Sequence, residues 1–335
     1  MTNASRLDRY CGRGMLLAAL ALSSIVAATT PGRAQTDYPN RPVHLVVGFA
    51  AGGGNDIMAR LVAAKLSELL GQAAVVENKP GAGGRLAAEY VSNQAADGYT
   101  LLVGASGAMS VAAAIYPDLK YHPTRTLTPL AELGSYPMVM TVGTGNPSRT
   151  VDELVAWAKA HPDKANYAST SPAFTITTEL LKLKTGMPGV MVPYKSSTEM
   201  VFSVVQDQTM TALADAAAAV PQVKAGKVKA LAVTGTGRSE ELPDVPSMAE
   251  AGYPDVDVRL WNGVFAPAAT PAAVVAKLEK ALSEAIRDPG VSAKLKNIAV
   301  EPGGGPPEEF RRKIDSDIVK FMAVVKAANL HFDEQ

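Results

Sequence analysis

Apolar positions along the chain follow two spacings that alternate from segment to segment. Continuous apolar runs, such as the one within residues 41–49, are typical of buried strands, whereas apolar residues recurring about every 3.6 positions indicate amphipathic helices. The first such helix ends at Leu70, and Gly71 follows it where a left-handed glycine commonly terminates a helix. Strands that alternate with helices of this length predict an α/β fold with parallel strands and right-handed crossovers.

The alternation runs in two series. The first has predicted strands at 41–49, 74–77 and 99–103, with helices ending at Leu70 and near Gln94. The second begins after Gly134, with strands at 138–142, 165–169, 190–192, 210–213 and 230–234 and helices at 151–160, 175–184, 198–206 and 221–225. A strand at 258–265 and helices at 272–287, 291–297 and 307–328 complete the chain. We therefore expect two α/β lobes.

The first residues have the order of a secretory signal. Arg6, Arg9 and Arg13 precede an apolar run at 15–28, and the small-residue exit Gly32-Arg33-Ala34 follows it. The run is shorter than the roughly twenty residues that a membrane-spanning helix needs. We therefore expect export to the periplasm with cleavage after Ala34, the alternative being an uncleaved membrane anchor.

Composition narrows the class of protein further. The single cysteine, Cys11, precedes the apolar run and would leave with the signal, so the mature protein has no disulfide and no cysteine metal site. Apolar residues make up 47% of the sequence, enough for a large core. Lys and Arg number 32, as do Asp and Glu, so no net charge favours nucleic acid or an anionic membrane. The expected partner is a small molecule or another protein.

A glycine-rich loop, 48–56, joins the first predicted strand to the first helix. Ligands of open α/β sheets bind at the carboxyl ends of strands, where glycines admit a ligand and the N–H groups of a helix start favour an anion. The alternative is a tight turn in which Asn55 or Asp56 caps the helix, with Arg60 as the surface partner of Asp56. The candidate ligand contacts of this loop are Phe49, Ala51, Gly53, Gly54 and Asn55.

Two further loops follow predicted strands and carry small hydroxyl-bearing residues. In segment 104–108, Ser106 and Gly107 could bind a carboxylate or an ordered water, or form a plain turn. Segment 169–175 precedes a predicted helix, so its hydroxyl groups and the helix start could hold an acid, with N-capping as the alternative. The candidates there are Ser169, Thr170, Ser171, Phe174 and Thr175.

The sequence offers no catalytic residue, no metal site and no cofactor site. The glycine run lacks the Lys-Ser/Thr continuation of a P-loop, and segment 52–57 lacks the third glycine of the dinucleotide fingerprint. Segment 104–108 lacks the spacing of a nucleophile elbow. The histidines have neither metal-ligand spacing nor a partner that suggests a base. They are His44, His122, His161 and His331. We therefore expect a binding protein and not an enzyme.

Short stretches across nearly the whole mature chain form an ordered and recognisable set. They are Tyr38-Pro39-Asn40-Arg41-Pro42, Gly52-Gly53-Gly54-Asn55-Asp56, Val76-Glu77-Asn78-Lys79-Pro80-Gly81-Ala82-Gly83-Gly84, Asp97-Gly98-Tyr99-Thr100-Leu101-Leu102, Asn166-Tyr167-Ala168-Ser169, Val192-Pro193-Tyr194-Lys195, Lys224-Ala225-Gly226-Lys227, Leu242-Pro243-Asp244-Val245-Pro246 and Glu250-Ala251-Gly252. This set resembles the tripartite tricarboxylate transporter substrate-binding receptors, also called the Bordetella uptake gene family.

The resemblance implies a fold, a ligand class and a partner. The fold is the type II periplasmic-binding-protein fold, with lobes at 37–138 plus 257–335 and at 139–256, two crossovers, and a ligand cleft between the lobes. A carboxylate would be held by the loops around 49–55 and 169–175, partly through ordered waters. Relatives pass their ligand to a membrane permease and some feed sensor proteins, and the sequence leaves these two roles open. We expect a monomer.

For three residues, the sequence leaves two roles open. The chain is one residue shorter than many relatives before Phe174, which could stack on the apolar body of a ligand or face the core. Asp215 could select a ligand with a hydroxyl, amide or ammonium donor, since a bare carboxylate repels an acid, or it could cap the next helix. Trp261 lines the cleft or packs the lobe, and we favour packing. The expected ligand is a mono- or dicarboxylate, with aromatic and citrate-like acids among the candidates.

Overall fold

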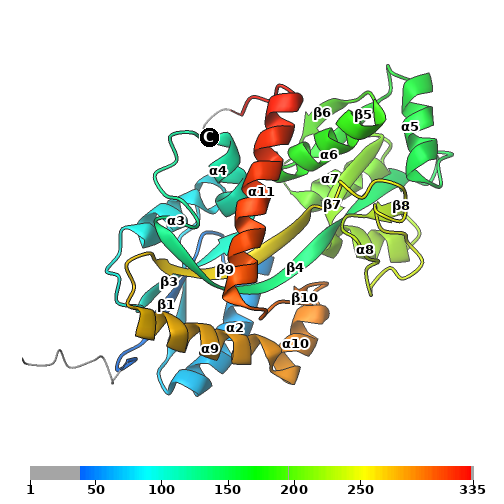
Figure 1. Ribbon diagram of the computed structural model, residues 1–335. Coiled ribbons are helices and arrows are strands. Elements are labelled where there is room, and N and C mark those ends of the chain that lie inside the picture. Colours follow the sequence, from blue (N-terminus) through cyan, green and yellow to red (C-terminus); the bar gives the residue numbers. More distant parts are fainter. Residues whose placement is uncertain (1–37, 195, 333–335) are drawn as a thin grey trace, which may run out of the picture. The chain divides into compact units, whose positions relative to one another are not determined.

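The computed structural model describes residues 38–194 and 196–332, which make up most of the compact unit that begins at Pro39. Ten strands of this part join in one sheet with the order β2-β1-β3-β9-β4-β7-β5-β6, and β10 and β8 also pair with β4 (Figure 1). The expected signal peptide at 1–34 and its cleavage after Ala34 lie outside the described residues.

The first half of the sheet is built from the two ends of the compact unit. Strands β1 (Val43–Val47), β2 (Ala74–Asn78) and β3 (Thr100–Ala105) are parallel, as predicted, and β9 (Arg259–Pro267) runs antiparallel to β3. The helices of these segments are η2 (Ala82–Gly84), α2 (Gly54–Leu70), α3 (Arg85–Ser92), α9 (Ala272–Arg287), α10 (Pro289–Lys296) and α11 (Pro307–Ala327).

The second half of the sheet comes from the middle of the chain. Strand β5 (Asn166–Ser169) lies parallel to β6 (Val190–Pro193) and to β7 (Thr211–Asp215), and β8 (Val228–Val233) completes the set. The helices here are α5 (Val151–Ala160), α6 (Pro172–Thr185), α7 (Ser197–Val205) and α8 (Ala216–Lys224). This series of strands and helices is the second one that the sequence predicts.

One long strand, β4 (Leu127–Gly143), belongs to both halves. Its first part pairs with β9, and from Met138 onward it pairs with β7 and β8, so β4 and β9 run side by side through the centre of Figure 1. The sequence predicts only its second part, 138–142, because Pro129 and Pro137 interrupt the strand pattern. The structure tolerates Pro129 because the pairing with β9 shifts register beside it, and a bulge leaves room for a residue without an N–H.

Several helix boundaries differ from the prediction for local reasons. Helix α6 begins at Pro172 and not at 175, since the fixed φ of proline suits the first turn of a helix. Helix α8 begins at Ala216 and not at 221, because Asp215 caps it and accepts the Ala218 N–H at 3.0 Å. Gly71 ends α2 in the left-handed conformation with a φ of 67°, as predicted.

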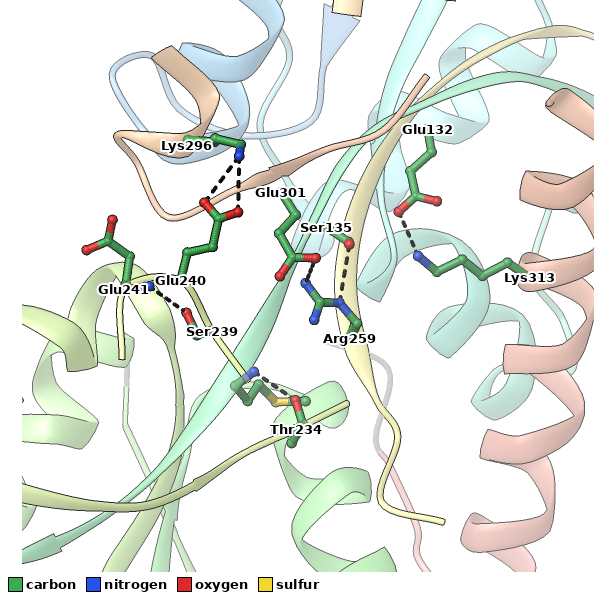
Figure 2. A network of polar contacts seen from close by, with 11 residues as sticks. Glu132, Ser135, Thr234, Ser239, Glu240, Glu241, Arg259, Lys296, Glu301 and Lys313 are labelled. Carbon is green, nitrogen blue, oxygen red and sulfur yellow. Dashed lines mark hydrogen bonds and ion pairs between the residues drawn. The ribbon is translucent and has the colours of Figure 1, made fainter. Parts of the chain in front are cut away.

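Charged side chains gather where the two halves of the sheet meet (Figure 2). Arg259, at the start of β9, forms an ion pair with Glu301 of β10 (Glu301–Pro302) at 2.7 Å, and its Nε donates to Ser135 of β4 at 3.3 Å. Lys296 of α10 pairs with Glu240, which follows β8, at 3.1 Å. The exposed pair of Lys296 and Glu240 contributes at most about 1 kcal/mol, and the backbone ladder of β4 and β9 connects the two halves directly.

Apolar clusters on both halves of the sheet contribute to the core of the described residues. The cluster of the first half contains Trp261, which is fully buried and meets Phe310 edge to face with ring centroids 5.0 Å apart. Its indole Nε1 donates to Asp317 of α11 at 2.9 Å. The expectation that Trp261 packs the core is therefore confirmed.

Candidate functional site

A buried carboxylate holds the glycine-rich loop in front of α2. Asp56 is 3% exposed and accepts hydrogen bonds from the Gly52 N–H, Arg60 Nε and Asn78 Nδ2, each at 2.9 Å. Asn78 Nδ2 also donates to the carbonyl oxygen of Phe49 at 3.0 Å. These contacts fix the loop from Phe49 to Gly52 against the first turn of α2.

The same contacts set the charge of Asp56. Its hydrogen bond from Arg60 is the largest influence, and with the bonds from Gly52 and Asn78 it outweighs burial and lowers the pKa of Asp56 to about 2. Asp56 is therefore ionised at neutral pH, and the guanidinium of Arg60 compensates its charge. The predicted pairing of Asp56 with Arg60 is confirmed.

Helix α2 begins without a side-chain cap. Its N-cap residue is Gly53 in an extended conformation, and among the described residues no side-chain cap accepts a hydrogen bond from the first-turn amides. The alternative in which Asn55 or Asp56 caps this helix is therefore wrong, because Asp56 reaches back to Gly52 and the Asn55 side chain bonds elsewhere. The positive end of the helix is left to other acceptors.

Strand β9 connects the first predicted loop to the second. The side chain of Asn262 donates through Nδ2 to Oδ1 of Asn55, at the first turn of α2. The next residue back, Trp261, accepts the Ser106 N–H at 2.9 Å, and its own N–H donates to Ser106 Oγ at 3.3 Å. Asn55 and Ser106 therefore bond to two adjacent residues of β9, Asn262 and Trp261.

The second loop is a wide turn and not the plain turn of the alternative. Gly107, which is exposed, begins the π-helical segment η3 (Gly107–Val111), and α4 (Ala112–Ile115) continues it. The Val111 N–H bonds to the carbonyl of buried Ser106 at 3.1 Å, five residues back. Such turns often occur at functional sites. Segment η3 packs against α6, the helix that the third loop leads into.

Hydroxyl groups hold the third loop, 169–175, in its conformation. Ser169 Oγ and Thr175 Oγ1 lie 2.8 Å apart, and the Ser171 carbonyl oxygen lies 3.2 and 3.4 Å from them respectively, so the two hydroxyl protons are shared among these three contacts. Ser169 and Thr175 are buried, whereas Thr170 and Ser171 are partly exposed. Ser171 is the N-cap residue of α6 and makes no side-chain cap bond. The accessible hydroxyls are therefore those of Thr170 and Ser171.

For Phe174 and Asp215, the structure shows the structural role of the two that the sequence left open: Phe174 packs in the core and Asp215 caps a helix. Phe174 is 8% exposed and belongs to the apolar cluster of the second half of the sheet. Asp215 caps α8 and lies opposite Met138 in the ladder of β4 and β7. Burial raises the pKa of Tyr136 on β4, and the charge of Asp215 raises it further. A ligand contact by Phe174 or Asp215 stays a prediction.

Other features of the described residues lie away from these loops. Two surface hollows of about 430 and 350 Å³ are lined by residues outside the predicted site, such as Trp157 and Asp207 in the first and Glu279 and Arg287 in the second. Within residues 38–194 and 196–332, no His, Cys, Asp or Glu cluster suits a metal ion. No helix of that part has the length and apolarity to cross a membrane.

Sequence reasoning missed two residues of this region. Asn78 stands at the end of an ordinary strand, and nothing in its neighbourhood marks it as a partner of Asp56. Asn262 is different, because a polar residue between Trp261 and Gly263 interrupts an apolar strand. A buried polar side chain is informative, and this interruption could have singled out Asn262.

Comparison with known proteins identifies one family and several similar proteins. Residues 58–330 match the family of tripartite tricarboxylate transporter receptors. BugT of Bordetella pertussis is 31% identical over 316 residues, covering 93% of this chain and 95% of BugT. The R. palustris protein Rpa4515 with adipate is 33% identical, with a TM-score of 0.76, and the match covers 88% of this chain and 99% of that protein.

Two further solved structures are similar to this chain over most of its length. MatC from Rhodopseudomonas palustris with bound malate is 33% identical with a TM-score of 0.73, covering 86% of this chain and 100% of MatC. The periplasmic binding protein BugD is 32% identical with a TM-score of 0.73, covering 88% and 99% of the two chains. These likenesses confirm the two-lobed α/β fold expected from the sequence. The chain belongs to the receptor family of the tripartite tricarboxylate transporters.

Proposed function

We propose that this protein captures a small organic carboxylate in the periplasm, performs no chemistry on it, and delivers it as a monomer to a membrane permease. The ligand would lie between lobes formed by 37–138 plus 257–335 and by 139–256. The observation that carries this proposal is the start of α2, where first-turn amides without a side-chain cap follow a loop that Asp56 holds in place.

The start of α2 suits an anion on physical grounds. A helix of 17 residues presents the equivalent of roughly half a positive charge at its N-terminus, and a hydrogen bond to a charged acceptor contributes about 1.5–3 kcal/mol. A Cβ at Gly52 or Gly54 would meet no atom within 4 Å, so the backbone is open on that side. A carboxylate can therefore approach these amides closely.

A second helix start supports a ligand with two acid groups. Helix α6 also begins without a side-chain cap, next to the partly exposed hydroxyls of Thr170 and Ser171. A dicarboxylate could place one group at each helix, and closure of the lobes would add contacts from both sides. The names of two relatives support this class, since one structure holds adipate and another holds malate.

A thermal-shift and calorimetric screen of organic acids tests the proposal, with adipate and malate as the first probes. A ligand at 100 times its dissociation constant stabilises the folded state by about 2.7 kcal/mol, which raises the melting temperature by several degrees. We expect one-to-one binding of at least one acid. Stabilisation by sugars or nucleotides, with none by any acid, would overturn the proposal.

Gly53→Asp tests the anion site itself. Gly53 has a negative φ, and a Cβ there would meet only the Ala50 carbonyl oxygen at 3.4 Å, so aspartate fits and caps α2. We expect this variant to be at least as stable as the wild type but to bind acids about 100-fold more weakly, because its carboxylate occupies the amides. Gly53→Ala is the matched control and should retain binding.

Delivery to a permease has its own test. Deletion of the gene should abolish uptake of the acid that the purified protein binds, and the intact gene should restore it. Unchanged uptake, together with loss of a transcriptional response to that acid, would assign the protein to a sensor instead.

A further inference from the structure

Asn262 is a fully buried polar residue in the middle of β9. Its backbone lies in the ladder between Ala105 of β3 and Gly134 of β4. Its side-chain Nδ2 donates to Asn55, whereas its Oδ1 is buried and has no hydrogen-bond partner among the described residues. Leaving a buried acceptor unpaired is unfavourable by about 1–3 kcal/mol, so this oxygen requires an explanation.

The alternation of β9 fixes where this side chain lies. Successive residues of a strand point to opposite faces of the sheet. Trp261 points toward α11, where it donates to Asp317, so Asn262 occupies the other face, against Asn55 of α2. The unpaired oxygen therefore belongs to a side chain that contacts Asn55 in the first turn of α2, and it lies one residue from Trp261, whose backbone bonds to Ser106.

We propose that Asn262 is a specificity-determining residue whose Oδ1 accepts a hydrogen bond from a hydroxyl group next to the carboxylate of the ligand. This inference rests on the proposed function, and it narrows the ligand to a 2-hydroxy acid. A hydroxyl fits this place better than an ammonium group, because Asn262 is neutral and the nearby carboxylate of Asp56 is already paired with Arg60. An unsubstituted acid would leave the oxygen unpaired.

The test compares acids that differ in one substituent. The sets are propionate, lactate and pyruvate; succinate, malate and oxaloacetate; glutarate, 2-hydroxyglutarate and 2-oxoglutarate; and the pair of tricarballylate and citrate. Calorimetric titration of the wild type should favour the hydroxy member of whichever set binds by about 10-fold or more, which is about 1.4 kcal/mol. Equal binding of the unsubstituted acid would overturn the inference.

The 2-oxo acids test the direction of the hydrogen bond. A keto oxygen can only accept, so it gains nothing from Oδ1 of Asn262. Tighter binding of the oxo member would show that the amide presents its nitrogen to the ligand, and it would overturn the assignment. Failure of every acid to bind would overturn the proposed function itself, whereas acid binding without a hydroxyl preference would overturn only this inference.

Substitution of Asn262 assigns the preference to this residue. Asn262→Leu keeps a similar volume without an acceptor, and the preference for the hydroxy acid should fall to about 3-fold or less, mainly through weaker binding of that acid. Asn93→Leu is the matched control, since Asn93 is exposed at the end of α3, and it should keep the preference. Equal weakening of both acids by Asn262→Leu would mean a purely structural role and overturn the proposal. Asn262→Ala repeats the measurement if the leucine variant does not fold.

Discussion

The first and third loops of the candidate site present helix starts in similar ways but are held by different chemistry. The loop before α2 depends on an ionised, buried Asp56 with three donors, one of them charged. The loop before α6 depends on neutral hydroxyls, with Ser169 and Thr175 bonded to each other and to the Ser171 carbonyl. Only the loop before α2 should therefore lose stability at low pH. Replacing Asp56 should also lower stability more than replacing Ser169 or Thr175.

The largest expected effect comes from Asp56→Asn. An amide cannot accept three hydrogen bonds as a carboxylate does, and its NH₂ group would face donors. Since Asp56 is buried and its pKa is lowered to about 2, we expect a loss of about 2 kcal/mol in the free energy of unfolding, measured with denaturant. Affinity for acids should fall about 10-fold or more as the loop loosens.

Asp152→Asn is the control for this substitution. Asp152 also lies in the first turn of a helix, α5, but it is exposed. Its replacement should leave acid binding unchanged. Equal effects of the two substitutions on acid binding would show that the effect of Asp56→Asn does not come from the loop before α2.

The acid dependence of stability sharpens the comparison. The pKa of Asp56 is lower in the folded state, about 2, than its ordinary value of 3.8. Its contribution is therefore complete above the unfolded value and is lost as pH falls toward the folded value. The difference in unfolding free energy between the wild type and Asp56→Asn should shrink from about 2 kcal/mol at pH 7 toward zero near pH 2. The difference between the wild type and Ser169→Ala should stay constant over this range, and a parallel decline would contradict the account.

Asp215→Ala should have an intermediate effect. Loss of the N-cap of α8 should lower stability by about 1 kcal/mol in denaturant unfolding. Removing the charge should also lower the raised pKa of Tyr136 in part, as followed by ultraviolet titration, since burial is its main cause. If Asp215 selects the ligand, affinity should fall more for an acid with a hydrogen-bond donor than for one without. Equal losses for both would reject that role.

The smallest expected effect is the coupling between Ser169 and Thr175. Ser169→Ala and Thr175→Val should each lower stability by about 1 kcal/mol, and the double variant should be less damaging than their sum by about 0.5 kcal/mol. A double-mutant cycle by chemical denaturation measures this coupling. Strict additivity would show that the contact of 2.8 Å does not hold the loop.

The residues show why the sequence predicts some features and not others. The bounds of α5 and α9 agree with the prediction because the apolar spacing is local and regular. The first part of β4 and the first turns of α8 were missed because Pro129 and Pro137 lie within the strand and Pro221 lies within the helix, where local preference disfavours proline. Tertiary context outweighs local preference at these positions.

The features of the candidate site also divide into those that the sequence predicts and those that it does not. The glycine and hydroxyl loops were predicted as segments, and the pair of Asp56 and Arg60 follows from helix spacing. The contacts of Asn78 with Asp56 and of Asn262 with Asn55 join residues 22 and 207 positions apart. No local pattern encodes such contacts, so only the folded chain reveals them.

The central claim is that backbone amides at the start of α2 attract the negative group of the ligand. Its most direct test is calorimetric titration of the protein with the acid found in the screen and with the matching neutral amide of that acid. The account predicts one-to-one binding of the acid and binding of the amide weaker by about 100-fold or more. Equal affinity for the two compounds would contradict it.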